Sequence, residues 1–228
     1  IDTCKPFLNN EKVDINIRSI KNNRNLIAFE SQYDSLMIIL KNDRFKYTNE
    51  DVTYCIENQR YPGTLDVFEL FLNGLLYEND ENHKNPLNLK IDFTDEQLSR
   101  IFNKLCITDD RVELAKRFYS KFSDKIDVNY ASKKNCSFCL LDAIDCDCCK
   151  MVEYLLNISE LDLNIRASTG SVNSHMNDND NVTPFNFAVA CGKDEIIHLF
   201  FKRKSDFDIN EGPTTCLHLA ASRDDALL

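Results

Sequence analysis

Asp178-Asn179-Asp180-Asn181-Val182-Thr183-Pro184-Phe185-Asn186-Phe187-Ala188 is the stretch that decides the fold predicted for this chain. It begins with a run of turn formers. Thr183 then stands where a helix N-cap belongs, and Pro184 occupies the first helical position, where its missing N–H costs nothing. Gly192 follows the last apolar residues of this pattern and readily adopts the left-handed conformation that ends a helix. The stretch therefore predicts a turn and a short helix that ends at Gly192.

A second helix and a short closing phrase follow Gly192. Asp194 and Glu195 begin this helix, where their charges oppose the positive end of the helix dipole. The apolar face of the helix is too broad for exposure on one side, so we expect it to be sandwiched between neighbours. It consists of Ile196, Ile197, Leu199, Phe200 and Phe201. The phrase Phe207-Asp208-Ile209-Asn210 closes the unit.

The closing phrase recurs along the chain. It stands earlier as Val13-Asp14-Ile15-Asn16, Ile126-Asp127-Val128-Asn129 and Leu161-Asp162-Leu163-Asn164. Each copy follows an amphipathic segment, and the spacing fits a repeat of roughly 38 residues. A unit of this size cannot bury its own apolar face, so the sequence predicts a stack of supersecondary units.

These residues resemble a known repeat family. The run 183–188 resembles the Thr-Pro-Leu-His-x-Ala signature of the ankyrin repeat, and Asp208-Ile209-Asn210 resembles its closing Asp-Val-Asn. Thr215-Cys216-Leu217-His218-Leu219-Ala220-Ala221 repeats the signature, with Cys216 where proline is usual. The resemblance implies an all-α ankyrin-repeat solenoid of stacked helix-turn-helix units, in which His218 holds its turn by hydrogen bonds.

The repeat is predicted to form one array over residues 1–228. We expect paired helices at 25–32 with 33–40 and at 50–58 with 65–76, and Thr94-Asp95-Glu96-Gln97 has the form of a capping box. The predicted units are a partial unit 1–18, helix pairs at about 19–47, 48–93, 94–130, 131–166 and 178–210, and a truncated unit 211–228. The polar stretches 78–89 and 167–180 are predicted as long loops.

Charge and hydropathy narrow the classes of function. The net charge is −10 and the pI is near 4.9, and Lys and Arg are scattered among Asp and Glu. This disfavours nucleic acid and favours a partner protein with a basic surface. No apolar run is long enough to span a membrane and the N-terminus lacks a secretory signal, so we expect a soluble, cytoplasmic protein without membrane insertion. Because the first residue is Ile and the last segment stops inside a motif, we expect a piece of a longer chain.

Ten cysteines raise the question of disulfides or a metal. Free thiols in a reducing compartment are the prediction, because disulfide frameworks belong to small secreted domains. Cys136, Cys139, Cys146, Cys148 and Cys149 contain enough thiols for a zinc site. However, Cys139 and Cys146 stand at the two ends of one predicted helix, too far apart for one ion. We therefore expect no metal and no cofactor.

The predicted function follows from the resemblance. The four His form no triad pattern and the five Gly form no phosphate-binding loop, so the chain is predicted not to be an enzyme. Ankyrin arrays are protein-binding scaffolds, and the family's concave binding surface maps here to Lys134, Asn135, Ser137, Asp145, Cys146, Asn179, Asp180, Val182, Ala190, Cys191, Ser222 and Arg223. A regulatory ankyrin domain of a larger enzyme or channel is one alternative, and a zinc-stabilised domain built on Cys136–Cys149 is another.

Overall fold

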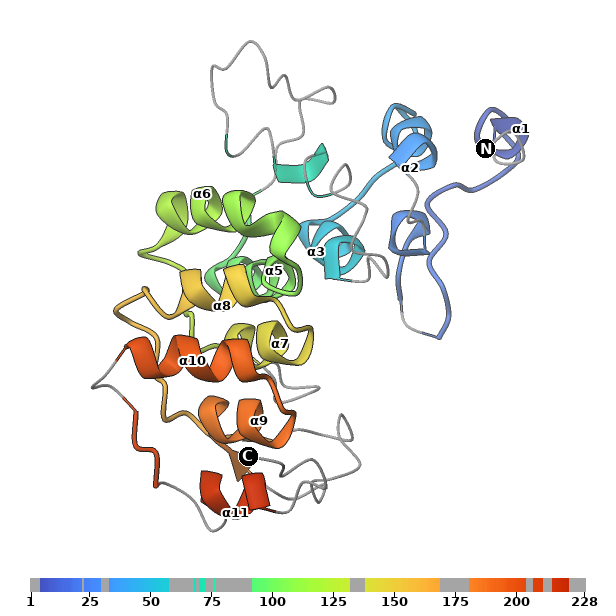
Figure 1. The fold of residues 1–228 in the computed structure, drawn as a ribbon. Coiled ribbons are helices and arrows are strands. Elements are labelled where there is room, and N and C mark those ends of the chain that lie inside the picture. The colour runs from blue at the N-terminus through green and yellow to red at the C-terminus, as the bar shows by residue number, and fades with distance from the viewer. Residues whose placement is uncertain are drawn as a thin grey trace. The chain divides into compact units, whose positions relative to one another are not determined.

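The structure of this chain is a computed structural model. It describes residues 5–21, 23–29, 33–57, 68, 70–72, 76, 92–131, 138–168, 181–203, 207–210 and 215–221. The chain divides into two compact units, Ile1–Ile101 and Phe102–Leu228, and the division falls inside helix α5 (Asp95–Leu105). The described residues are mostly helical, as the sequence predicts (Figure 1). None of their helices is long and apolar enough to cross a membrane.

The first unit begins with short elements. These are α1 (Lys5–Leu8), the 3₁₀ turn η1 (Leu26–Phe29), α2 (Tyr33–Leu40) and α3 (Asn49–Glu57). Residues 68, 70–72 and 76 are also helical, within the helix predicted at 65–76. The helix predicted at 33–40 is confirmed, and the one predicted at 50–58 is present one residue earlier. The helix predicted at 25–32 is wrong over 25–29, where only η1 forms and packs on α3.

Ion pairs join α3 to the start of α5 within this unit. Arg100 Nη2 lies 2.6 Å from Glu57 Oε2, and its Nη1 lies 3.2 Å from Glu50 Oε2. Gln97 Nε2 also donates to Glu50 Oε2 at 3.1 Å. Partial burial alone would raise the pKa of Glu50, but the hydrogen bonds from Gln97 and Arg100 outweigh it and the pKa is lowered.

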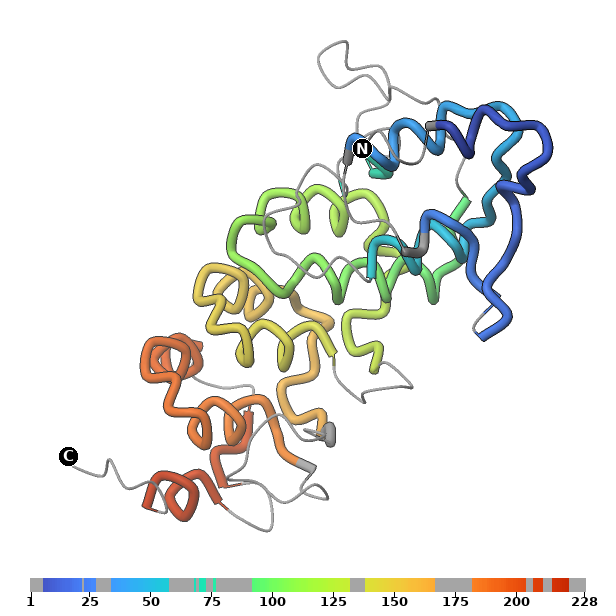
Figure 2. Tube along the Cα trace, turned by 90° about the vertical axis from the view of Figure 1, so that its right-hand side faces the viewer, coloured from blue at the N-terminus to red at the C-terminus, as the bar shows by residue number. Residues whose placement is uncertain are grey.

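The second unit is a stack of helical hairpins. After η3 (Asp109–Arg111) and α6 (Val112–Phe122) come the hairpins α7 (Cys139–Asp145) with α8 (Cys149–Leu155) and α9 (Pro184–Ala190) with α10 (Asp194–Lys202), then α11 (Cys216–Ala221). Helix α9 contacts α7 and α11, and α8 contacts α6 and α10. Figures 1 and 2 show the two resulting rows, with α6, α8 and α10 in one and α7, α9 and α11 in the other. Each hairpin therefore covers the apolar faces of its neighbours.

Two short strands close the base of the predicted loop 167–180. β1 (Ala167–Ser168) pairs antiparallel with β2 (Asn181–Val182), with Ala167 opposite Val182. The loop prediction is thus wrong for residues 167 and 168, which lie in a strand. Residues 169–180 and the loop predicted at 78–89 fall outside the described residues.

Predicted helix starts are found where local hydrogen bonds define them. Thr94 N donates to Gln97 Oε1 at 3.0 Å and Gln97 N donates to Thr94 Oγ1 at 3.3 Å, so the predicted capping box is confirmed. Thr183 caps α9, since its Oγ1 accepts from Asn186 N at 3.3 Å, and Pro184 is the first residue of that helix. Local sequence therefore determines where these helices begin.

The apolar face of α10 is covered only in part. Ile196 and Phe200 are fully buried, and Phe200 packs edge to face on Phe185 with the ring centroids 5.6 Å apart. Phe201, however, is 47% exposed. Among the described elements, no helix after α11 covers this side of α10. The expectation of a fully sandwiched helix is therefore wrong at Phe201.

The hairpins α7–α8 and α9–α10 have the same type of loop between their two helices. After α9, Gly192 N donates to Val189 O and Lys193 N donates to Ala188 O; after α7, Asp147 N donates to Ile144 O and Cys148 N donates to Ala143 O. These paired bonds form a Schellman motif, which needs a left-handed residue just after the helix. Gly192 has φ 66° and Asp147 has φ 59°. Asp147 thus holds a conformation that glycine adopts at lower cost.

We expect Asp147→Gly to raise the free energy of unfolding by about 0.5–1 kcal/mol, because glycine avoids the contact between Cβ and backbone at positive φ. Gly192→Ala should lower it by about 1 kcal/mol for the same reason. Urea titration followed by circular dichroism measures both changes. A loss of stability in Asp147→Gly would show that the Asp147 side chain matters more than its backbone conformation.

Candidate partner-binding surface

The closing phrases all fold into the same turn. In each, the backbone N–H of the Asn donates to the side-chain Oδ1 of the Asp two residues earlier, at 2.9 Å in all four copies. Such turns form because a short carboxylate can replace a backbone acceptor. The repeated sequence thus has one repeated local structure.

The Asn of one phrase then bonds to the next phrase along the stack. Asp162 N donates to Asn129 Oδ1 at 2.8 Å, and Asn129 Nδ2 donates to Glu160 O at 2.8 Å. Asp208 N donates to Asn164 Oδ1 at 3.0 Å. These bonds fix the spacing and register of neighbouring units on this side of the stack.

The first unit contains the same bridge, which reveals a closing phrase that the sequence reasoning missed. Lys46 N donates to Asn16 Oδ1 at 2.7 Å, and Asn16 Nδ2 donates to Arg44 O at 2.8 Å. Lys46 therefore takes the place that Asp162 takes in the second unit. Phe45-Lys46-Tyr47-Thr48 is a closing phrase without its Asp and Asn.

The two Schellman loops lie next to each other at the C-terminal ends of α7 and α9. Helices α7 and α9 are in contact, and Lys193 Nζ of the second loop lies 3.5 Å from Asp147 Oδ1 of the first. We call these loops, residues 145–148 and 190–193, the paired-loop surface. Asp145, Cys146 and Asp147 are exposed on it, whereas Ala190 and Cys191 are half-buried.

The charges of the paired-loop surface are mainly acidic. Asp145 and Cys146 are exposed by area, but surrounding protein atoms still displace part of the water around them. This desolvation raises the pKa of Asp145, and the charge of Lys193 opposes it. Desolvation also raises the pKa of the Cys146 thiol, and the carboxylates of Asp145 and Asp142 raise it further. Cys146 is therefore a neutral thiol at pH 7, and the surface presents carboxylates around one lysine.

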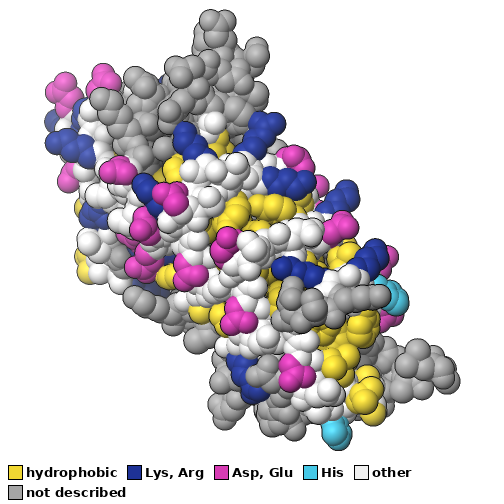
Figure 3. Space-filling model, turned by 90° about the vertical axis from the view of Figure 1, so that its left-hand side faces the viewer, with side chains coloured by type: hydrophobic (Ala, Val, Ile, Leu, Met, Phe, Trp, Pro, Cys, Tyr) yellow, Lys and Arg dark blue, Asp and Glu magenta, His cyan; other side chains and the backbone are white. Residues whose placement is uncertain are grey.

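Elsewhere the charges are mixed. Figure 3 shows a face on which acidic and basic side chains are interspersed, with hydrophobic side chains between them. Within the described part of this face there is no continuous basic stripe, in agreement with the charge pattern of the sequence.

The structure locates five of the twelve residues predicted for partner binding. Asp145, Cys146, Ala190 and Cys191 lie together on the paired-loop surface. Val182 lies in β2 and is only 8% exposed, so the expectation that it is a surface contact is corrected. Strand pairing turns its side chain into the core. The other seven fall outside the described residues; they are Lys134, Asn135, Ser137, Asn179, Asp180, Ser222 and Arg223.

The cysteines of the proposed zinc cluster point to different surroundings. Cys139 Sγ is buried and donates to Val128 O at 3.2 Å, whereas Cys149 Sγ donates to Glu195 Oε2 at 3.4 Å. Burial raises the pKa of Cys148 to about 12 and that of Cys149 to about 11. Cys136 lies outside the described residues, and those that are described contain no group of three His, Cys, Asp or Glu side chains placed to hold a metal.

The final signature keeps its local hydrogen bond. Thr215 Oγ1 and His218 Nδ1 are 2.8 Å apart, across the start of α11. This is the use expected for His218 from the resemblance, and it occupies the imidazole in a structural contact.

Two residues of the paired-loop surface were not found from the sequence. Asp147 stands at the same loop position as Gly192, so an alignment of the two hairpins on Cys146 and Cys191 could have found it. Lys193 carries no sequence signal, because its partner Asp147 belongs to another repeat. Comparisons with protein-family models, with curated proteins and with solved structures find no match to this chain.

Proposed function

We propose that this chain is a protein-binding scaffold built from degenerate ankyrin repeats, and that it binds a partner protein on the paired-loop surface. The observation that carries the proposal is the pair of identical loops after α7 and α9, which present Asp145, Cys146, Ala190 and Cys191 side by side. The Schellman hydrogen bonds fix the backbone, so little entropy is lost when a partner binds.

The repeat type is supported by three further contacts. Thr183 caps α9 ahead of Pro184, Thr215 is bonded to His218, and the Asp-x-Asn turns recur with one geometry. These are the positions at which the chain resembles the ankyrin signature. They support the family proposal independently of overall sequence similarity.

The partner is proposed to be a protein with a basic surface. Asp145 and Asp147 are exposed on the paired-loop surface, and the whole chain carries a net charge of −10. Opposite charges accelerate encounter more than they strengthen the final complex. The proposed array has no role for nucleic acid or membrane.

Charge reversal at the paired loops tests the site. A partner captured from extracts of the source cell should bind the double variant Asp145→Lys/Asp147→Lys at least about tenfold more weakly, since loss of a central contact commonly costs more than 1 kcal/mol. Asp124→Lys is the matched control, because Asp124 is exposed in the turn after α6, away from the paired loops. If the double variant and Asp124→Lys lose the same affinity for the partner, the partner does not bind at the paired-loop surface.

Ionic strength tests the charge argument separately. We expect the association rate constant to fall by about tenfold or more between 50 mM and 500 mM salt, because steering by opposite charges is screened. The dissociation rate should change much less. Stopped-flow or biolayer measurements at several salt concentrations give both rates, and an association rate independent of salt would contradict a basic partner surface.

A further inference from the structure

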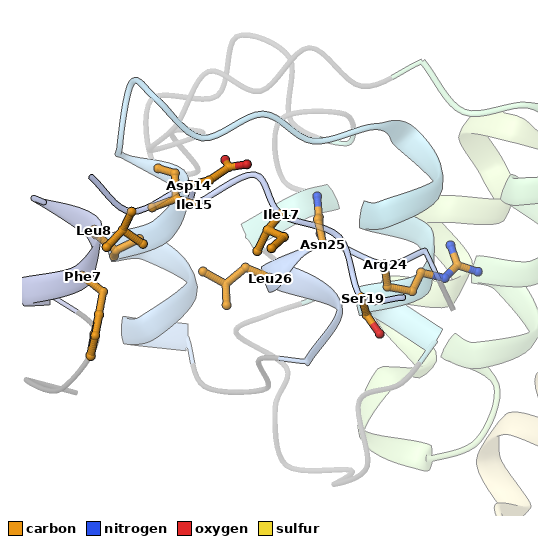
Figure 4. Close-up of a pocket in the computed structure, with 10 residues that line it drawn as sticks. Phe7, Leu8, Asp14, Ile15, Ile17, Ser19, Arg24, Asn25 and Leu26 are labelled. Atoms are coloured by element: carbon orange, nitrogen blue, oxygen red, sulfur yellow. The ribbon is translucent and has the colours of Figure 1, made fainter. Parts of the chain in front are cut away.

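We draw no further inference here: the strongest candidate, the open and mostly apolar cavity between α1 and the chain around η1 in the first unit (Figure 4), carries none, because nothing in the structure shows what covers it.

Discussion

Asp51→Ala is expected to lower the free energy of unfolding by about 3 kcal/mol, since it removes the charged acceptor that Arg18 and Thr48 share and a helix cap with it. Asp51 is only 1% exposed, and Arg18 donates to both of its carboxylate oxygens, at 3.1 and 2.6 Å. Thr48 N and Thr48 Oγ1 also donate to Oδ2, at 3.0 and 2.8 Å, and cap α3. One substitution therefore disrupts a helix cap and the ion pair with Arg18 together. Urea titration followed by circular dichroism measures the loss.

The pH dependence of the unfolding free energy tests whether the Asp51 carboxylate causes this loss of stability. Burial alone would raise the pKa of Asp51, but the hydrogen bonds from Arg18 and Thr48 outweigh it and the pKa lies below its ordinary value. A lowered pKa in the folded state contributes stability above the ordinary value of about 3.9, and this contribution is lost as the pH falls through the folded value. The difference in unfolding free energy between the wild type and Asp51→Asn should thus be constant near neutral pH and shrink in acid.

Asp43 provides the control for this prediction. It is exposed in the turn that follows α2. Asp43→Ala should change the free energy of unfolding by less than about 0.5 kcal/mol, as is usual for surface substitutions. A similar effect of Asp43→Ala and Asp51→Ala would mean that net charge, and not the ion pair with Arg18, determines the loss.

The sequence predicts the fold well where the signal is local. Thr94-Asp95-Glu96-Gln97 contains both halves of its capping box, and Thr183-Pro184 contains a cap and a first residue that fit only a helix start. The apolar residues around Leu26 and Ile27 also have helical spacing, yet they form a 3₁₀ turn. Periodicity shows that Ile27 is buried but does not fix the backbone that buries it.

The missed closing phrase has a clear physical reason. Asn16 bonds to the backbone carbonyl of Arg44 and to the backbone N–H of Lys46. Every residue except proline offers these two groups, so the side chains of the acceptor phrase are free to vary. The Asn that donates is visible in the sequence, whereas the phrase that it contacts is not.

The candidate surface was predictable only in part for similar reasons. Asp145 and Cys146 were predicted from the resemblance to the ankyrin surface, and the structure leaves them exposed. Val182 was misplaced because pairing between β1 and β2 depends on residues on both sides of a long polar stretch.

Asn129→Ala is expected to lower the free energy of unfolding by about 2 kcal/mol, because two hydrogen bonds to the next phrase are lost at roughly 1 kcal/mol each. In a stack of hairpins, stability is the sum of each hairpin and its contacts with neighbours. Asn129 contributes to the contact between two neighbouring repeats, because its side chain accepts a hydrogen bond from Asp162 N and donates one to Glu160 O. Its loss should therefore also broaden the unfolding transition, which a urea titration would show as a smaller slope.

Two further variants separate the bridge from a general effect of removing an amide. Asn157 is exposed, and its Nδ2 donates to Glu153 O within its own hairpin at 2.7 Å, so Asn157→Ala should cost less than about 0.5 kcal/mol and leave the slope unchanged. Asn129→Asp keeps an acceptor for Asp162 N but faces Glu160 O without a donor, and should lose at least half as much stability as Asn129→Ala. If Asn129→Ala and Asn157→Ala unfold alike, the hairpins are coupled by apolar packing, and the Asn bridges only follow from it.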